Sequence, residues 1–260
     1  MKPSKIADIK NELNSKLNNM SFHSSQSTME SFITTYSTDT RMGVKKLVTK
    51  AEKVIDDYLN ECERMKYMLT YEKRFESFTI GGIDEAGRGP LAGPVVAACV
   101  ILSKDDPIAY VNDSKKLSAA KREQLYNEII ERAVSYGIGV VGEQDIDSMN
   151  ILQATYKAMT IAISQCNIQP TQLLNDAVII PGINLPQEKI IQGDGKSLSI
   201  AAASILAKVS RDRIMVAYDE LFPEYGFKQH KGYGSYDHIQ AIKTYGPSSI
   251  HRKTFIKNFI

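Results

Sequence analysis

The chain has 260 residues, 43% hydrophobic and 24% charged, with a formal net charge of +2, values typical of a globular protein with one sizeable domain and an accessory segment. No run of about 18 apolar residues occurs, which excludes a membrane span, and residues 1–19 lack the apolar core of a signal peptide. The three cysteines, Cys62, Cys99 and Cys166, are scattered, which disfavours a disulfide framework or a structural zinc site and favours the reducing cytoplasm.

Residues 1–77 are expected to form a helical N-terminal extension. Apolar residues recur at helical spacing in 6–20 and again in 44–65, on either side of a Ser/Thr-rich stretch at 21–40. The first 80 residues carry 13 basic and 11 acidic side chains, so this segment is not a basic arm for nucleic acid. We expect it to pack on the body of the protein or to bind a protein partner.

Residues 78–260 are expected to form an α/β domain. Apolar, β-rich runs predict strands over 78–84, 94–102, 136–142, 173–176 and 188–193. Helical patterns predict helices over 118–136, 146–165 and 199–221. Ser118 is the expected N-cap of the first of these helices, and Gly137 its expected stop. Strands followed by alternating helices and strands imply a mixed sheet with helices on its faces.

Carboxylates stand at the ends of three predicted strands. The four acids are Asp84, Glu85, Asp176 and Asp194. In open α/β sheets ligands bind where strands end, and four acids gathered there would repel one another unless cations neutralise them. Oxygen ligands of this kind suit Mg²⁺, and two such ions can activate a water and stabilise the leaving oxygen of a phosphodiester. Taken singly, each acid could equally be a turn former or a helix cap.

A glycine-dense loop over 86–94 follows the first acidic pair. Its glycines would let backbone N–H groups approach a ligand closely. A nucleotide-binding P-loop is the rival interpretation, since Gly82 to Gly87 fits its glycine spacing. That interpretation fails because Arg88 and Gly89 replace the lysine and hydroxyl residue that grip phosphate and Mg²⁺. It would also place two acids inside a phosphate cradle.

The C-terminal stretch is basic. From Phe227 to Ile260 there are six Lys or Arg residues against one acid, Asp237. Such a local excess favours a polyanionic partner, although a solvated basic tail would give the same composition.

Several blocks of sequence, in order, resemble the signature blocks of bacterial type 2 ribonuclease H, the ribonuclease HII family. They are GIDEAGRGPLAGPVVAACVIL, NDSKKLS, NILQAT, AAASILAKVSRD and FPEYGFKQHKGYG, and the likeness runs from about Ile80 to Phe255. The resemblance implies a ribonuclease H-like mixed sheet flanked by helices. It also implies an endonuclease, acting as a monomer with Mg²⁺ or Mn²⁺, on RNA/DNA hybrids or on duplex DNA with embedded ribonucleotides. Such enzymes cut 5′ of the ribonucleotide by two-metal-ion catalysis and leave 3′-OH and 5′-phosphate ends.

The resemblance also implies a catalytic, metal-binding tetrad. Asp84 and Glu85 match its first two members. Asp176 matches the third within Leu-Asn-Asp-Ala, where the family has glycine after the aspartate. Asp194 matches the fourth within Gln-Gly-Asp-Gly, where the family has Lys-Gly-Asp-Ser. These departures, at Ala177 and Gly195 among others, bear on the shape of the two loops.

Further positions are implied to bind the substrate. Gly87, Arg88 and Gly89 match the motif whose backbone senses the ribose 2′-OH, the group that distinguishes RNA from DNA. Tyr233 matches a tyrosine that stacks on a sugar next to the junction, although a half-buried surface tyrosine is the plainer alternative. Phosphate contacts, which position a duplex without reading its bases, are implied for Ser114, Lys115, Lys116, Lys208 and Arg211.

Two alternatives accompany this interpretation. The sister family, ribonuclease HIII, carries Gly-Lys-Gly in the loop, a glutamate as the fourth acid and a β-sheet N-terminal domain. Arg88, Asp194 and the helical extension favour type HII on all three counts. A catalytically silent duplex-binding module is the alternative from another class, and metal-dependent cleavage would distinguish it.

Overall fold

The structure, a computed structural model, describes residues 4–75 and 79–259 and divides into two compact units between Tyr67 and Met68. The predicted domain boundary between residues 77 and 78 lies outside the described residues, as do the start of the first predicted strand and both ends of the predicted extension. The helices of the first unit are α1 (Ile6–Asn19), α2 (Ser25–Tyr36) and α3 (Met42–Met68). Within the described residues, no helix has the length and apolar character needed to span a membrane.

The first unit is helical, as the sequence predicts, and has its own core. Ile9 and Leu13 of α1 pack with Met29 and Phe32 of α2 and with apolar residues of α3. The Ser/Thr-rich stretch carried no helix prediction, yet it forms α2 because two large apolar side chains, Met29 and Phe32, are buried from it. Burial of a few apolar residues therefore outweighs the polar composition of that segment.

The second unit contains one five-stranded mixed sheet. Its strands are β1 (Ile80–Ala86), β2 (Val95–Ile101), β3 (Ser135–Val141), β4 (Gln172–Asp176) and β5 (Gln187–Ile190), in the order β3-β2-β1-β4-β5. The pairs β1–β2 and β2–β3 are antiparallel, whereas β1–β4 and β4–β5 are parallel. Ile83 of β1 lies beside Asn175 of β4, so the next residues along the two strands, Asp84 and Asp176, are brought to the same end of the sheet.

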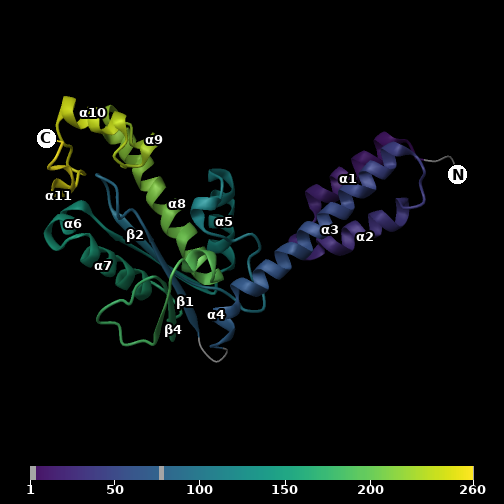
Figure 1. Ribbon diagram of the computed structural model, residues 1–260, viewed down its shortest axis with the longest axis horizontal. Coiled ribbons are helices and arrows are strands. Elements are labelled where there is room, and N and C mark those ends of the chain that lie inside the picture. The colour runs from purple at the N-terminus through teal and green to yellow at the C-terminus, as the bar shows by residue number, and fades with distance from the viewer. Residues whose placement is uncertain (1–3, 76–78, 260) are drawn as a thin grey trace. The chain divides into compact units, whose positions relative to one another are not determined.

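Helices cover both faces of this sheet (Figure 1). The helices on these faces are α5 (Ala119–Arg132), α6 (Glu143–Met149), α7 (Ile151–Ser164) and α8 (Leu198–Leu221). α5 and α8 pack on one face and α6 and α7 on the other, each pair burying a separate apolar cluster. The run Ala201 to Ala203 of α8 is fully buried, in agreement with the close approach to the sheet that its small side chains predict.

Two of the predicted helices have different limits. The first ends at Arg132, and Gly137 lies inside β3 instead of stopping a helix. A Cβ at Gly137 would lie 2.0 Å from the carbonyl oxygen of Ala162, so glycine serves there to let α7 approach the strand. The second predicted helix is broken at Asn150, which has φ of 71° and accepts hydrogen bonds from the first N–H groups of α7.

The remaining elements are short or lie near the C-terminus. They are α4 (Thr70–Lys73), α9 (Phe227–His230), α10 (Tyr236–Tyr245), α11 (Lys253–Ile256) and the 3₁₀ turns Phe22–Ser24, Ser114–Lys116, Gly193–Gly195 and Pro223–Tyr225. The C-terminal helices share an apolar cluster with Leu91, Ala92 and Met215. The loop after β1 is therefore built into the C-terminal part of the chain.

The segment before β1 is anchored to α8 by a buried carboxylate. Glu72 of α4 is 5% exposed. Its Oε1 accepts hydrogen bonds from Ser197 Oγ at 2.6 Å, Ser199 Oγ at 2.7 Å and Ser199 N at 3.0 Å. A negative charge at the N-terminal end of a helix is favourable. Because Ser197 N–H also donates to the Gly193 carbonyl, Glu72 helps to fix the turn between β5 and α8.

Glu72→Ala should therefore lower the free energy of unfolding by about 2 kcal/mol, since hydrogen bonds to a charged group contribute about 1.5–3 kcal/mol. Chemical denaturation of the variant and the unsubstituted chain measures the difference. Glu63→Ala is the matched control, because Glu63 forms an exposed ion pair with Lys66 and such pairs contribute little. Equal losses in both variants would contradict the anchoring role of Glu72.

Candidate active site

Asp84 lies on β1 and forms the centre of an acidic site. Its carboxylate is 5% exposed, and its Oδ1 accepts a hydrogen bond from the Glu85 N–H at 2.7 Å. Burial raises the pKa of Asp84 well above its usual range, and the neighbouring charges of Glu85 and Asp176 raise it further. A carboxylate kept in such a place is costly unless a cation accompanies it.

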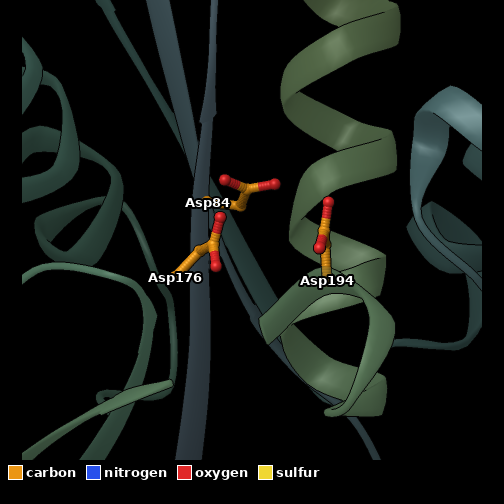
Figure 2. A group of neighbouring side chains, drawn as sticks. All are labelled: Asp84, Asp176 and Asp194. Atoms are coloured by element: carbon orange, nitrogen blue, oxygen red, sulfur yellow. The ribbon is translucent and has the colours of Figure 1, made fainter. Parts of the chain in front are cut away.

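Asp176 and Asp194 approach Asp84 from two further elements. Asp176 ends β4 and accepts a hydrogen bond from the Gly193 N–H at 2.7 Å, which links it to the turn that carries Asp194. Asp194 is nearly buried just before α8. Burial raises its pKa, and the charges of Asp113 and Asp176 raise it further. Figure 2 shows the three carboxylates converging from β1, from the end of β4 and from the turn before α8.

These three carboxylates could hold a metal ion. Each of Asp84, Asp176 and Asp194 offers one oxygen, and the three oxygens lie within 4.8 Å of one another. The mutual repulsion that raises two of the pKa values is the property that a bound cation would relieve. Carboxylate oxygens are ligands of hard divalent cations such as Mg²⁺ and Mn²⁺. The donor set therefore fits a divalent metal.

Glu85, the fourth predicted ligand, is next to this group but outside the three-residue cluster. Its Oε1 accepts a hydrogen bond from Arg88 Nη1 at 3.3 Å. Burial raises its pKa, and the Arg88 guanidinium opposes that shift. Glu85 therefore lies at the edge of the cluster, where its side chain is held by Arg88.

A cleft of about 480 Å³ opens beside the acids and gathers most of the predicted substrate-binding residues. It is lined by Asp84, Glu85, Ala86, Gly87, Arg88, Gly89, Ser114, Lys115, Ser204, Lys208 and Tyr233. A second hollow of about 530 Å³ surrounds Asp176 and Asp194 and includes Lys115 and Lys116. Tyr233 is 46% exposed at the edge of the first cleft, which leaves its ring accessible to a ligand.

The residues predicted to contact phosphates differ in how exposed they are and in whether they already have a partner. Lys115 Nζ lies 3.6 Å from Asp194 Oδ2 and its side chain is otherwise exposed. Lys116 is an exposed side chain near Asp113, and Lys208 pairs with Asp212 at 2.7 Å. Ser114 is buried, and its hydroxyl lies 2.9 Å from that of Ser204.

Arg211 does not have the environment of a phosphate ligand. It is 1% exposed, and its guanidinium donates to the carbonyls of Pro94, Lys231 and Ala92 at 2.9, 3.0 and 3.2 Å. Reaching a phosphate would require breaking these three hydrogen bonds. The expected phosphate contact of Arg211 is therefore replaced by a role in holding two loops together.

Arg252, which sequence reasoning did not single out, has a similar role. It is fully buried and donates to the carbonyls of Gly87 at 2.6 Å, Gly93 at 2.9 Å and Arg88 at 3.0 Å. Burial and, to a lesser extent, the Arg211 charge lower its pKa to about 9. The loop carbonyls thus face a guanidinium. Within the part of the chain that the structure describes, the N–H groups of residues 87–89 donate no hydrogen bond, which leaves them available to a ligand.

Other neighbours of the acids were also missed. Asp113 acts on the Asp194 carboxylate, and Ser204 donates a hydrogen bond to Asp84 that lowers its pKa. Asp113 stands in the same short motif as Ser114 and Lys115, so its position could have been noticed. Ala177 has φ of 55°. Glycine adopts this conformation more readily than alanine does, so the backbone is strained where alanine replaces the family's glycine.

Comparison with protein families assigns the chain. Residues 81–258 match the family described as "Ribonuclease HII", and residues 5–76 match "Ribonuclease HII N-terminal domain". The chain belongs to the ribonuclease HII family. It is therefore an endoribonuclease, and the resemblance seen in the sequence blocks is confirmed.

Known ribonucleases HII are similar over most of their length. Ribonuclease HII of Lachnoclostridium phytofermentans is 57% identical over 224 residues, which is 86% of this chain and 88% of that protein. Ribonuclease HII of Clostridioides difficile is 53% identical over 225 residues, 85% and 88% of the two chains. The crystal structure of ribonuclease H2 from Pyrococcus horikoshii OT3 matches with 27% identity and a TM-score of 0.56, covering 67% of this chain and 92% of that one. The predicted ribonuclease H-like fold is confirmed.

Proposed function

We propose that this enzyme hydrolyses the phosphodiester 5′ of a ribonucleotide, in RNA/DNA hybrids or in duplex DNA with embedded ribonucleotides, and leaves 3′-OH and 5′-phosphate ends. The convergence of Asp84, Asp176 and Asp194 beside a cleft lined by the 87–89 loop and Tyr233 carries the proposal. Such a site combines metal ligands with backbone donors in one place, as cleavage at a ribose requires.

The four acids would hold two divalent ions, Mg²⁺ or Mn²⁺. Asp84, Asp176 and Asp194 would bind directly, and Glu85 would join them from the edge of the cluster. When bound, the ions activate a water and stabilise the leaving oxygen of the phosphodiester. Asp84 and Asp194 are held in place for this task by the Glu85 N–H and by the turn bonded to Asp176. No side-chain nucleophile is required.

The loop and the tyrosine would select the ribose. The N–H groups of residues 87–89 face no partner within the described chain, and Arg252 holds the carbonyls of the same loop. We propose that these N–H groups recognise the 2′-OH, which identifies RNA at a given site. Tyr233, exposed at the edge of the cleft, would stack on the sugar next to the junction, while Lys115, Lys116 and Lys208 would contact phosphates.

The decisive experiment is cleavage of an end-labelled DNA duplex that carries one ribonucleotide, with Mg²⁺, Mn²⁺ or EDTA in parallel. We expect a single cut 5′ of the ribonucleotide with either metal and none with EDTA. A matched all-deoxy duplex should stay intact. Cutting that persists in EDTA would contradict the metal mechanism, and binding without cutting under either metal would favour a silent duplex-binding module.

Duplex binding should weaken with salt, because the proposed lysine contacts are to phosphate. Each neutralised phosphate contributes about −0.9 to the slope of log K against log salt, so Lys115, Lys116 and Lys208 predict a slope on the order of −3. Titrations by fluorescence anisotropy at several salt concentrations, with Ca²⁺ in place of Mg²⁺ to prevent cutting, measure it. Lys115→Gln should reduce the magnitude by about 1, whereas Lys53→Gln, on the exposed side of α3, should not. A slope near zero would show that the enzyme does not bind the duplex through its phosphates.

We also propose that the enzyme acts in the cytoplasm, and that the N-terminal unit serves as an appendage to a catalytic domain. Cys62, Cys99 and Cys166 are all free thiols, which fits a reducing compartment. All four acids and the cleft beside them lie in the second unit. A partner bound by the first unit would therefore act through recruitment to the substrate.

A further inference from the structure

Three of the four histidines of the chain gather beneath the turn that carries Tyr233. His230 belongs to α9, His238 to α10, and His251 lies two residues before the start of α11. His238 and His251 are 0% and 2% exposed, and the His230 and His238 rings are stacked with centroids 4.4 Å apart. These imidazoles take no part in the proposed chemistry, and the burial of His238 and His251 excludes direct contact between those two rings and a substrate.

Hydrogen bonding fixes the protons on two of the rings. The Ser248 N–H can only donate, and it lies 2.9 Å from His251 Nδ1, so that nitrogen is an acceptor. A neutral His251 therefore carries its proton on Nε2, which lies 3.0 Å from His238 Nε2 and donates to it. His238 in turn carries its proton on Nδ1 and donates to the Tyr233 carbonyl at 2.8 Å. Each hydrogen bond is therefore donated in the same direction, from Ser248 through His251 and His238 to the Tyr233 carbonyl.

Both rings must be neutral for this arrangement. A proton added to either histidine would place two N–H groups against each other between the Nε2 atoms, or one against the Ser248 N–H. Burial lowers the pKa of His238 and of His251 to about 4, in agreement with that requirement. A charge on His230 would act in the same direction on both rings.

The turn that receives this hydrogen bond is strained. Lys231 and Gly232, directly before Tyr233, have φ of 53° and 84°. A non-glycine residue in this conformation costs about 1–3 kcal/mol and persists only where surrounding contacts enforce it. The Tyr233 carbonyl accepts from the Ser235 N–H and from His238, and Arg211 binds the Lys231 carbonyl. His238 is thus one of the contacts that enforce the turn.

We infer that His238 and His251 are positioning residues for Tyr233, and that the directed hydrogen bonds from Ser248 through both rings hold the tyrosine in place to contact the sugar of a ribonucleotide-containing duplex. The inference rests on the proposed function, because it gives Tyr233 its substrate role. It concerns the geometry of binding and leaves the metal ligands untouched.

Amide side chains test the direction at each ring. The asparagine amide nitrogen is attached to Cγ, as Nδ1 of histidine is, whereas the glutamine nitrogen reaches the place of Nε2. His238→Asn therefore retains a donor to the Tyr233 carbonyl, and His238→Gln loses it. At the other ring, His251→Gln retains a donor to His238 and His251→Asn loses it. The preferred substitution is thus opposite at the two positions.

We expect His238→Gln and His251→Asn to raise KM for the single-ribonucleotide duplex roughly three- to tenfold, the change that the loss of one net hydrogen bond corresponds to. Their kcat at saturating Mn²⁺ should change less than about twofold, and Mn²⁺ affinity by calorimetry should not change. His238→Asn and His251→Gln should rescue most of the KM defect. In a Tyr233→Ala background, His238→Gln should raise KM no further.

If the same amide, asparagine or glutamine, gave the lower KM at both positions, the histidines would have a packing role and the inference would be overturned. A further rise in KM from His238→Gln in the Tyr233→Ala background would also overturn it. Nitrogen-15 NMR of the unsubstituted protein provides a readout independent of activity and of the folding of variants. It should show protonated Nδ1 for His238 and protonated Nε2 for His251, and the opposite tautomers would overturn the inference. An unsubstituted enzyme that leaves the ribonucleotide duplex intact would instead overturn the proposed function.

Discussion

Asp84→Asn should reduce metal-dependent cleavage by at least about 100-fold while leaving the protein folded and, without metal, more stable. Metal ions contribute several kcal/mol to such a reaction, and about 1.4 kcal/mol corresponds to tenfold in rate. The substitution removes one of three carboxylates whose oxygens lie within 4.8 Å of one another. It keeps an oxygen that can accept the Glu85 N–H.

The gain in stability has a defined pH dependence. Because burial and the charges of Glu85 and Asp176 raise the pKa of Asp84 in the folded state, the folded protein binds that proton more tightly than the unfolded chain does. The favourable contribution of the protonated acid is complete below the unfolded pKa of about 3.9 and is lost as pH rises through the raised folded value. Asp84→Asn should lack this loss in EDTA.

Cleavage rates with Mg²⁺ and thermal unfolding in EDTA across pH measure the two effects. Asp145→Asn is the matched control, since Asp145 forms an exposed ion pair with Lys157 and should change neither. An Asp84→Asn variant with a tenth or more of the original activity in Mg²⁺ would refute the assignment of Asp84 as a ligand.

The second large effect is expected from alanine at Gly87. Gly87 has φ of +95°, and an added Cβ would lie 2.1 Å from Arg211 Nε and 2.8 Å from the Pro94 carbonyl oxygen. The backbone strain alone costs about 1–3 kcal/mol, and the collision displaces a guanidinium that binds three carbonyls. Gly87→Ala should therefore lose more than about 2 kcal/mol of stability and most of its cleavage activity.

Gly89→Ala separates stability from recognition. No atom lies within 4 Å of a Cβ at Gly89, and its φ is not in the left-handed region, so the free protein should unfold as the unsubstituted one does. If the loop approaches the 2′-OH closely, the methyl group should still impair cleavage of the ribonucleotide duplex. Unfolding curves, together with cleavage of matched ribo and deoxy duplexes, test both variants. A Gly89→Ala enzyme of full activity would show that the backbone does not approach the substrate at that residue.

The gathering of three of the acids at one end of the sheet could be predicted from where they stand in the sequence. Each of the three clustered aspartates follows or ends a short apolar run, and parallel pairing of β1 with β4 brings the run ends together. The limits of helices were less predictable. Gly137 is a residue type that often ends a helix, yet it belongs to β3, where its lack of a side chain lets α7 pack closely. That contact is not visible in the local sequence pattern.

Burial of charge was the main point that sequence could not supply. Arg211 and Lys208 stand three residues apart on one helix, and both carry a positive charge. Only the fold shows that Arg211 faces inward, toward carbonyls from two distant loops. Arg252 binds carbonyls of Gly87 and Arg88, more than 160 positions earlier in the chain, so no spacing rule could have revealed it.

The short separation along the chain between Asp84 and Gly87 fixes the distance between the acidic site and the glycine loop. Asp84 lies on strand β1 and Gly87 just beyond its end, with only Glu85 and Ala86 between them. Their backbones are therefore at most about 10 Å apart, at roughly 3.5 Å per residue. The sheet and the Arg252 guanidinium hold the two ends of this interval. Under the proposed function, the offset between the sugar that is recognised and the phosphate that is cut would therefore be set by the protein backbone. Moving the ribonucleotide by one step along a duplex should move the cut by the same step, whatever the neighbouring bases.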